Sequence, residues 1–491
     1  MAEFGQEGMI DRPDFGSDPD ARFFNEDIAP TKLEQRTWDK WQIAALWIGM
    51  SVCVPTYMLA SSLINSGMDW KQAVGTVFLA NLLVLVPMVL NAHAGTKYGI
   101  PFPVYCRLAF GLVGANVPAV MRGLVACGWF GIQTWIGGNA LYTLVLSLGA
   151  NLPPADPISP HAGQFVCFFL FWLINMAIVW KGIDSIKLLE KWSAPFLLAV
   201  GGCLLLWAYS RADGFGPMLS EPSKLDTWPK FWAAFGPGLT ANVSFWATLS
   251  LNIPDFTRFA RTQKDQMLGQ AMGLPPTMTA FAFIGVAVTS ATVVIFGEPI
   301  WDPIALSGRI GEGRPLVIFA SMFAFAIATL STNLAANVVS PANDFAHLAP
   351  RWISFRTGGL ITGVLGILVM PWKLLAQSNT YIFTWLGGYG SLLGSIGGIL
   401  LVEYWLVQKG QLELKDLYRE GGRYPLWRPS ALAAFFLGAA PCIPGFLHSI
   451  EAYPTAPQPF IDLYRFSIFV SFGLAAMLHL IFSLSRMRAR S

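Results

Sequence analysis

The stretch ALWIGMSVCVPTYMLASS (45–62) is apolar and carries Gly49 and Pro55 near its middle. Proline removes a backbone donor and clashes with the preceding turn, so a helix here is expected to be interrupted. A second stretch, FWAAFGPGLTANVSFWATLSLN (231–252), has Gly236-Pro237-Gly238 and Asn242 inside it. Because both residue types also occur in ordinary membrane helices, a simple kink in each stretch is the alternative.

The composition around these stretches is that of a polytopic membrane protein. The 491 residues are 54% hydrophobic and only 12% charged, with a mean hydropathy of +0.51. Soluble domains carry about 25% charged residues. The first 40 residues are polar and acidic, unlike a cleavable signal peptide. No basic cluster with interleaved aromatic residues is present, so nucleic acid is not an expected partner. We expect an all-α protein in contact with a lipid bilayer.

Twelve apolar segments are long enough to span a bilayer, which needs about 20 residues per helix. They cover approximately residues 42–64, 73–95, 116–148, 163–181, 194–211, 231–251, 273–297, 314–340, 358–377, 380–406, 430–449 and 465–485. An even number places both termini on one side. With that side inside, 24 of the 32 lysines and arginines are cytoplasmic, as the positive-inside rule requires. The sequence therefore predicts a multi-pass protein of the plasma (inner) membrane with cytoplasmic termini.

The two interrupted segments are each the first of a set of five. Broken helices at matching positions in two halves indicate a transporter built from inverted repeats, with its site between the breaks. The predicted organisation has six parts. They are a cytoplasmic tail (1–41), a first repeat (42–211), a second repeat (231–406), a cytoplasmic loop (407–429), two additional helices (430–485) and a C-terminal tail (486–491).

Charged and thiol groups offer little for catalysis. Six cysteines lie in or beside apolar segments without a CxxC pair, so buried thiols are expected in place of disulfides or metal ligands. Asp255, Asp344 and Glu403 fall near segment ends and are expected at the membrane interface. Paired carboxylates, a metal cluster or an activated nucleophile are not apparent, which argues against a membrane enzyme. A receptor that does not transport is left open.

Neutral polar residues mark the middle of the eighth segment. It contains ATLSTNLAAN (328–337), in which Ser331, Thr332 and Asn333 are adjacent and Asn337 lies one turn beyond. Back-bonding of Ser and Thr to the i−4 carbonyl is the structural alternative. Polar residues in consecutive positions favour a lined cavity, and hydroxyl and carbonyl oxygens suit a small dehydrated cation such as sodium.

The third segment carries GWFGIQTW (128–135), in which Trp129 and Gln133 lie on one helix face. A tryptophan face can stack on a flat ring, and a glutamine amide can pair with a –CO–NH– edge. Packing of Trp129 on lipid and bonding of Gln133 to another helix are the alternative. The combination predicts a planar, uncharged substrate with an amide in its ring.

Several motifs together resemble the nucleobase–cation symporter family (type one), which includes bacterial sodium–hydantoin transporters and allantoin permeases. The resemblance extends over almost the whole chain, from DIAPTKLEQRTW (27–38) to KDLYREGGRYPLWR (415–428). Its strongest markers are NAHAGTKYGIPFPV (91–104), ACGWFGIQTW (126–135), WATLSLNIPDFTRFAR (246–261), FGEPIWDP (296–303) and TLSTNLAANVVSPA (329–342). The resemblance implies a leucine-transporter-type fold of five plus five inverted helices with two more, working by alternating access.

The resemblance also implies roles for particular residues. Trp129 and Trp246 would sandwich the substrate ring, and Gln133 and Asn337 would read its edge. The cation, sodium, would be held by the carbonyls of Gly49, Val52 and Ala328 and by the hydroxyls of Ser331 and Thr332.

Cys53 departs from the family pattern, because the hydantoin transporter has glutamine there and allantoin permeases have asparagine. A thiol bonds weakly, which favours a compact ring such as uracil, a dihydropyrimidine or hydantoin. We therefore expect a monomeric symporter for such a ring, with no cofactor besides the coupling ion, Na⁺ or H⁺. An allantoin permease, a proton-coupled carrier and a passive facilitator are the alternatives.

Overall fold

The computed structural model describes residues 8–15, 20, 22–181, 183–311, 313–378 and 380–488. In these ranges the regular elements are all helices, accompanied by one isolated β-bridge between Trp38 and Ala260. The predicted all-α class is therefore confirmed for the described chain.

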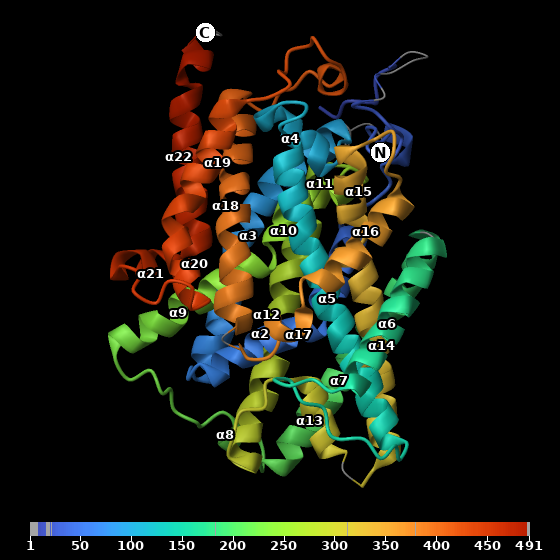
Figure 1. Cartoon of the computed structure of the whole chain (residues 1–491), viewed down its shortest axis with the longest axis vertical. Helices are drawn as coiled ribbons and strands as arrows, with labels where there is room; N and C mark the ends of the chain where they lie inside the picture. The colour runs from blue at the N-terminus through green and yellow to red at the C-terminus, as the bar shows by residue number, and fades with distance from the viewer. Residues whose placement is uncertain are drawn as a thin grey trace.

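Helices follow one another along the whole chain (Figure 1). The first half contains η1 (Leu33–Gln35), α1 (Lys40–Ser51), α2 (Val54–Asn65), α3 (Trp70–Tyr98), α4 (Phe102–Phe110), α5 (Asn116–Ser147), α6 (Ala162–Lys181), α7 (Ile183–Arg211), α8 (Phe215–Met218), α9 (Trp228–Phe245) and α10 (Ala247–Asn252). The second half contains α11 (Pro254–Thr257), α12 (Gln263–Phe296), α13 (Pro303–Ile310), α14 (Pro315–Asn337), α15 (Val339–Leu348), α16 (Phe355–Leu368), α17 (Pro371–Leu374), η2 (Thr380–Leu386), α18 (Gly387–Leu401), η3 (Val402–Val407), η4 (Lys415–Tyr418), α19 (Pro429–Ala439), η5 (Ala440–Cys442), α20 (Ile443–Ser449), α21 (Gln458–Tyr464) and α22 (Ser467–Arg488).

Several helix ends follow directly from the local sequence. The carboxylate of Asp39 accepts bonds from the backbone of Trp41 and Gln42, and Gln42 bonds back to Asp39, which starts α1 with a capping box. Asp69 starts α3 in the same way, and Gly99 ends that helix with a φ of 69°. Glycine adopts this left-handed conformation without a steric cost, so α3 ends there.

Seven helical stretches of the described chain are long and apolar enough to cross a membrane. They are Trp70–Tyr98, Ala162–Lys181, Gln263–Phe296, Pro315–Leu348, Thr380–Val407, Pro429–Ser449 and Ser467–Leu484. The pair α1 and α2 makes an eighth candidate, bent by 59° at its junction. The protein is thus a multi-helix membrane protein, as its composition predicts.

The first interrupted segment breaks between Gly49 and Pro55. Pro55 has no N–H to offer the carbonyl of Ser51, and that carbonyl accepts the amide of Cys53 instead (3.1 Å). The amide of Thr56 bonds the carbonyl of Cys53 (3.1 Å). In a continuous helix, the amides of Cys53 and Thr56 would bond the carbonyls of Gly49 and Val52. Both amides bond other carbonyls at the break. The carbonyls of Gly49 and Val52 are therefore candidate ligands.

The second interruption does not lie where the sequence places it. Gly236-Pro237-Gly238 and Asn242 all belong to α9, and the break falls at Trp246, between α9 and α10. The glycines serve close packing: a Cβ on Gly236 would meet Phe466 at 2.9 Å, and one on Gly238 would meet Leu63 at 2.9 Å. Pro237 removes only one helical bond, which a long packed helix tolerates.

The two broken helices pack reciprocally: each contacts the long helix that follows the other break. The pair α1 and α2 packs against α12, whereas α9 and α10 pack against α3. Beside them α5 and α14 run next to each other in opposite directions, and α19 and α22 pack against α18 (Figure 1). The start of the described chain and the end of α22 lie at the same end of the bundle (Figure 1), here called the terminal end, and the other end is called the opposite end.

The predicted N-terminal tail is held against the terminal end over most of its described length. Phe23 and Ile28 are buried, and the amide of Trp38 bonds the carbonyl of Phe259 (2.8 Å). Residues 1–7, 16–19 and 21 lie outside the described residues. The predicted C-terminal tail (486–491) begins inside α22, which extends to Arg488, and residues 489–491 are also outside the described part.

Candidate substrate and cation site

Trp129 is buried in the middle of α5. Its ring meets those of Phe245 (5.1 Å), Tyr381 (6.1 Å) and Trp385 (6.0 Å) edge-on. The adjacent Gly128 permits this arrangement, because a Cβ there would collide with the Trp385 ring. Rings from two elements, α9 and η2, therefore surround Trp129 in the perpendicular geometry that aromatic pairs favour.

Trp246 occupies the break between α9 and α10. Its ring meets Trp47 of α1 at 5.2 Å and Phe245 at 5.0 Å, both edge-on. Phe245 thus touches both tryptophans that the sequence predicts as a sandwich. Trp129, Phe245 and Trp246 therefore form one aromatic group, and Trp246 connects this group to α1 through Trp47.

The two predicted edge-reading amides lie on the neighbouring helices α5 and α14. Gln133 is buried, and its Oε1 has no hydrogen-bond partner within the described chain. Asn337 donates its Nδ2 to Oδ1 of Asn333 (3.1 Å). A buried carbonyl oxygen without a partner costs free energy, so Gln133 presents an acceptor that a ligand N–H can satisfy.

Contacts between α5 and α14 show how these amides line up. Asn333 donates to the carbonyl of Phe130 (3.2 Å), and Arg122 bonds Asp344 (3.1 Å) eleven residues further along α14 and its continuation. Residues later in α14 and its continuation therefore contact residues earlier in α5. The two helices are antiparallel. Asn337, one turn beyond Asn333, therefore lies at the level of Trp129.

The predicted cation residues come from α1 and α14, which pack against each other. Ser331 is fully buried, and its Oγ has no partner in the described ranges. Thr332 back-bonds to the carbonyl of Ala328 (3.0 Å), which is the alternative that the sequence left open for this hydroxyl. In the part of the chain that the structure describes, no group of three His, Cys, Asp or Glu side chains could hold a metal. A cation here would meet neutral oxygens, including the freed carbonyls of Gly49 and Val52.

Cys53 caps α2 at the first break and is buried. Its Sγ lies 3.2 Å from Oγ1 of Thr56, one turn further along. A small thiol bonded to its own helix offers little to a ligand edge. The contribution of the first break to a ligand is therefore mainly backbone and apolar surface.

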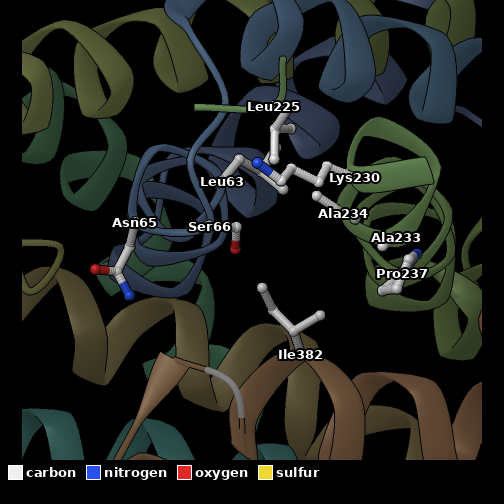
Figure 2. A pocket seen from close by; sticks show the side chains of 10 residues that line it. Leu63, Asn65, Ser66, Leu225, Lys230, Ala233, Ala234, Pro237 and Ile382 are labelled. Carbon is white, nitrogen blue, oxygen red and sulfur yellow. The ribbon is translucent and has the colours of Figure 1, made fainter. Parts of the chain in front are cut away.

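A cavity of about 430 Å³ lies between α2, α9 and η2 (Figure 2), and Figure 1 shows α2 and α9 towards the opposite end. Ile382 of η2 points into it, and the side chains of Ser66 and Lys230 border it (Figure 2). Asn65 also borders it and donates a hydrogen bond to Ser378 (2.7 Å). Asp226 lies in the loop before α9, and the hydrogen bond that it accepts from Lys230 (2.8 Å) lowers the pKa of its carboxyl.

The terminal end is closed by buried polar contacts. Arg122 pairs with Asp344 at 3.1 Å, and both side chains are 0% exposed. Asp255 accepts the amide of Phe102 at the start of α4 (2.7 Å). Glu403 pairs with Arg428 (3.0 Å) and with His479 (2.9 Å). The three carboxylates expected at the interface are therefore inside the protein, in structural contacts.

Sequence reasoning did not single out Phe245, Asn175 or Thr134. Phe245 gives no signal, since 36 phenylalanines occur in the chain. Asn175, by contrast, is the polar residue of FLFWLINMAIVW (169–180). A polar side chain within an apolar segment is a suspect by itself, so its signal was available in the sequence.

Comparison with known proteins places this geometry in a family. Residues 30–470 match the family described as permeases for cytosine/purines, uracil, thiamine and allantoin. The chain belongs to this family. The resemblance seen in the motifs is thereby confirmed, and the function class is that of a permease.

Named relatives cover most of the chain. It is 47% identical over 473 residues to a purine-uracil permease of Arabidopsis thaliana, covering 94% of this chain and 78% of that protein. It is 41% identical over 425 residues to the allantoin permease of Bacillus subtilis (strain 168), covering 85% and 86%. Its fold is similar to that of Mhp1, a nucleobase-cation-symport-1 family transporter solved with bromovinylhydantoin bound. The TM-score is 0.77 at 24% identity, with 95% of this chain and 96% of that chain covered.

Proposed function

We propose that this protein is a secondary active symporter that imports a planar, uncharged cyclic amide together with a cation, by alternating access. The observation that carries the proposal is the buried, unpartnered Oε1 of Gln133 on the same helix as Trp129. Trp246, at a helix break, joins this aromatic group through Phe245. A ring with an N–H edge satisfies the acceptor while its face stacks on an indole.

The topology proposed for this function has twelve spans with both termini in the cytoplasm, in the plasma (inner) membrane. Residues 42–211 and 231–406 form inverted repeats of five spans, followed by two further spans in a single functional chain. Reciprocal packing supports the repeats, because each broken helix packs on the helix that follows the other break. In this topology the terminal end is the cytoplasmic end.

The substrate is proposed to lie between Trp129 and Trp246, with Phe245 limiting the length of the ring that fits. Gln133 and Asn337 read opposite parts of its edge. Uracil, a dihydropyrimidine or hydantoin has the required –CO–NH– group in a compact ring. Cys53 adds no strong hydrogen bond, which limits how many polar groups of a ligand the site can satisfy.

Sodium is the proposed coupling ion. The unpartnered Oγ of Ser331 and the freed carbonyls of Gly49 and Val52 fit a small hard cation. Thr332 and the carbonyl of Ala328 complete the proposed set. A cation bound between α1 and α14 would hold the first break against α14, so that cation and substrate favour the same closed state. Proton coupling is the competing proposal, because it needs no such ligands.

The names of two relatives point to different substrates for this protein. The purine-uracil permease supports uracil, whereas the allantoin permease keeps allantoin as the second candidate. Allantoin carries a ureido arm that needs additional polar partners, and the thiol of Cys53 supplies no strong one. The compact ring is therefore preferred.

The test is uptake of radiolabelled uracil into cells expressing the chain, with external sodium or with choline in its place. Unlabelled hydantoin, dihydrouracil, allantoin, cytosine and thiamine compete in parallel assays. Uracil accumulation that collapses in choline and is competed by hydantoin supports the proposal. Equal potency of allantoin and uracil would overturn the compact-ring assignment, and accumulation that persists in choline would overturn sodium coupling.

A further inference from the structure

Three buried asparagines form a continuous row from α6 to α14. Asn175 belongs to α6, and Asn333 and Asn337 belong to α14. Asn175 and Asn333 are fully buried, and Asn337 is 6% exposed. We call these three residues the asparagine row. Only the last of them belongs to the proposed ligand site, so the other two need an explanation of their own.

The first two members have a fixed orientation. Asn175 donates its Nδ2 to the carbonyl of Phe171 (2.8 Å). A carbonyl can only accept, so the amide of Asn175 must turn its nitrogen towards Phe171 and its oxygen towards Asn333. Asn333 donates Nδ2 to that oxygen (3.2 Å) and also approaches the carbonyl of Phe130 (3.2 Å). Flipping either amide would bring oxygen against oxygen in a buried site.

A hydroxyl confirms the direction of the row. Thr134 gives its own proton to the carbonyl of Phe130 (2.7 Å). Its oxygen is therefore an acceptor towards Asn333, whose Nδ2 lies 3.1 Å away. Three acceptors surround the nitrogen of Asn333, so its Oδ1 is the end that faces Asn337.

The third member inherits its orientation from the second. Asn337 donates Nδ2 to Oδ1 of Asn333 (3.1 Å), and no bond to its own Oδ1 is present in the described chain. We propose that Asn175 and Asn333 are positioning residues that fix the order of donor and acceptor on the Asn337 amide, with Oδ1 as the acceptor offered to the ligand. This inference rests on the proposed function, in which Asn337 touches the substrate.

A fixed acceptor selects between rings of the same size and charge. Uracil carries a hydrogen on the ring nitrogen between its carbonyl groups, whereas the equivalent nitrogen of cytosine is a bare acceptor. Two acceptors facing each other leave both unpaired, and sites that bond a ligand N–H reject analogues without it strongly. The asparagine row therefore makes the site specific for the –CO–NH– edge of uracil or hydantoin over the edge of cytosine.

The experiment measures binding of uracil and of cytosine to the purified full-length protein, in sodium, by calorimetry. An unpaired buried acceptor costs about 1–3 kcal/mol, so uracil should bind the unmodified protein at least about 5-fold more tightly than cytosine. Asn333→Leu releases Asn337 to rotate, and the cytosine-to-uracil ratio of dissociation constants should fall by about 10-fold. Asn175→Leu removes one of three anchors and should lower the ratio less.

Asn81→Leu is the matched control. Asn81 is also fully buried and bonds its own i−4 carbonyl, that of Val77 (2.8 Å), but it lies on α3 away from the row. Its loss should leave the ratio unchanged, whereas a role of the row in folding alone would lower protein yield without altering the ratio.

The outcomes separate the inference from the proposed function. Equal affinity of the unmodified protein for uracil and cytosine would overturn the fixed acceptor even if neither variant folds. A ratio that stays constant in Asn333→Leu and Asn175→Leu, with uracil still bound, would overturn the role of the row and leave the proposed function intact. Failure of the unmodified protein to bind uracil, hydantoin and cytosine would overturn the proposed function first, and the inference with it.

Discussion

The two ends of the bundle are closed in different ways. At the terminal end, Arg107 donates to the carbonyls of Phe23 and Leu417 (both 2.8 Å), and the pair of Arg122 and Asp344 is completely buried. At the opposite end, a cavity of about 430 Å³ reaches in between α2, α9 and η2. Asn65, which borders this cavity, donates a hydrogen bond to Ser378 (2.7 Å).

This difference indicates which end is harder to open. Removing one partner of a buried ion pair leaves an uncompensated charge and costs about 3–5 kcal/mol. A single neutral hydrogen bond contributes only about 0.5–1.5 kcal/mol. Opening the terminal end would therefore break a buried charge pair, whereas widening the cavity at the opposite end would break neutral contacts such as the bond from Asn65 to Ser378.

The largest effect is expected from breaking the terminal end. Asp344→Ala leaves Arg122 charged and unpaired, and the free energy of unfolding should fall by about 3–5 kcal/mol. Denaturant titration of the purified protein in detergent measures this change. Asp462→Ala is the control, because its pair with Arg465 (2.8 Å) is partly solvent-exposed and should contribute less than about 1 kcal/mol. Equal effects of the two changes would contradict the comparison.

Between the two ends, the second largest effect is expected at Trp129. Trp129→Ala removes the proposed stacking face, and affinity for uracil should fall by about 10–100-fold, since stacking of a base on an aromatic ring contributes about 1–3 kcal/mol. Calorimetric binding measures the loss. Trp180→Ala on the outer face of α6, where the indole is 58% exposed, should bind normally. Unchanged affinity in well-folded Trp129→Ala protein would refute the site assignment.

A smaller effect is expected at the cation residues. Ser331→Ala removes one neutral oxygen, and the half-saturating sodium concentration for uracil uptake should rise by about 10-fold, the equivalent of one hydrogen-bond-sized contact of about 1.4 kcal/mol. Ser321→Ala serves as the control, because that hydroxyl back-bonds to Val317 on the same helix. A sodium dependence unaltered by Ser331→Ala would remove this residue from the cation site.

The smallest effect is expected at the opposite end. Asn65→Ala removes the bond to Ser378 and should favour the open cavity by about 0.5–1.5 kcal/mol. A cysteine at position 382, introduced as Ile382→Cys, reports this opening through its rate of labelling by a membrane-impermeant thiol reagent. The rate should rise by about 2–10-fold in the Asn65→Ala background. Labelling that slows, or stays the same, would show that this bond does not restrain the opposite end.

Local chemistry in the sequence predicted the helices and one of the two breaks. Each of the twelve predicted apolar segments overlaps at least one helix, because length and hydrophobicity are properties of the segment itself. Pro55 marked the first break correctly, because the hydrogen bond that its missing N–H cannot make belongs to the same helix and needs no distant contact to predict. Pro237 did not mark the second, because packing of Gly236 and Gly238 against other helices keeps α9 continuous up to Phe245.

Contacts between distant segments could not be predicted in this way. The partner of Asp344 is Arg122, 222 positions away, and a single sequence contains no signal for such a pairing. The contact of Phe245 with both tryptophans likewise depends on where the second break falls. Ser331 and Gln133 were found because polar residues in apolar segments are conspicuous, but their unpaired atoms became apparent only in three dimensions.

The central claim, coupled transport of a cyclic amide, is tested most directly with the purified protein in sealed proteoliposomes. Radiolabelled uracil is supplied outside, with an inward sodium gradient or with equal sodium on both sides. The account predicts accumulation above the external concentration that requires the gradient and disappears when a sodium ionophore dissipates it. Uracil that only equilibrates, with or without the gradient, would contradict symport and identify a passive facilitator.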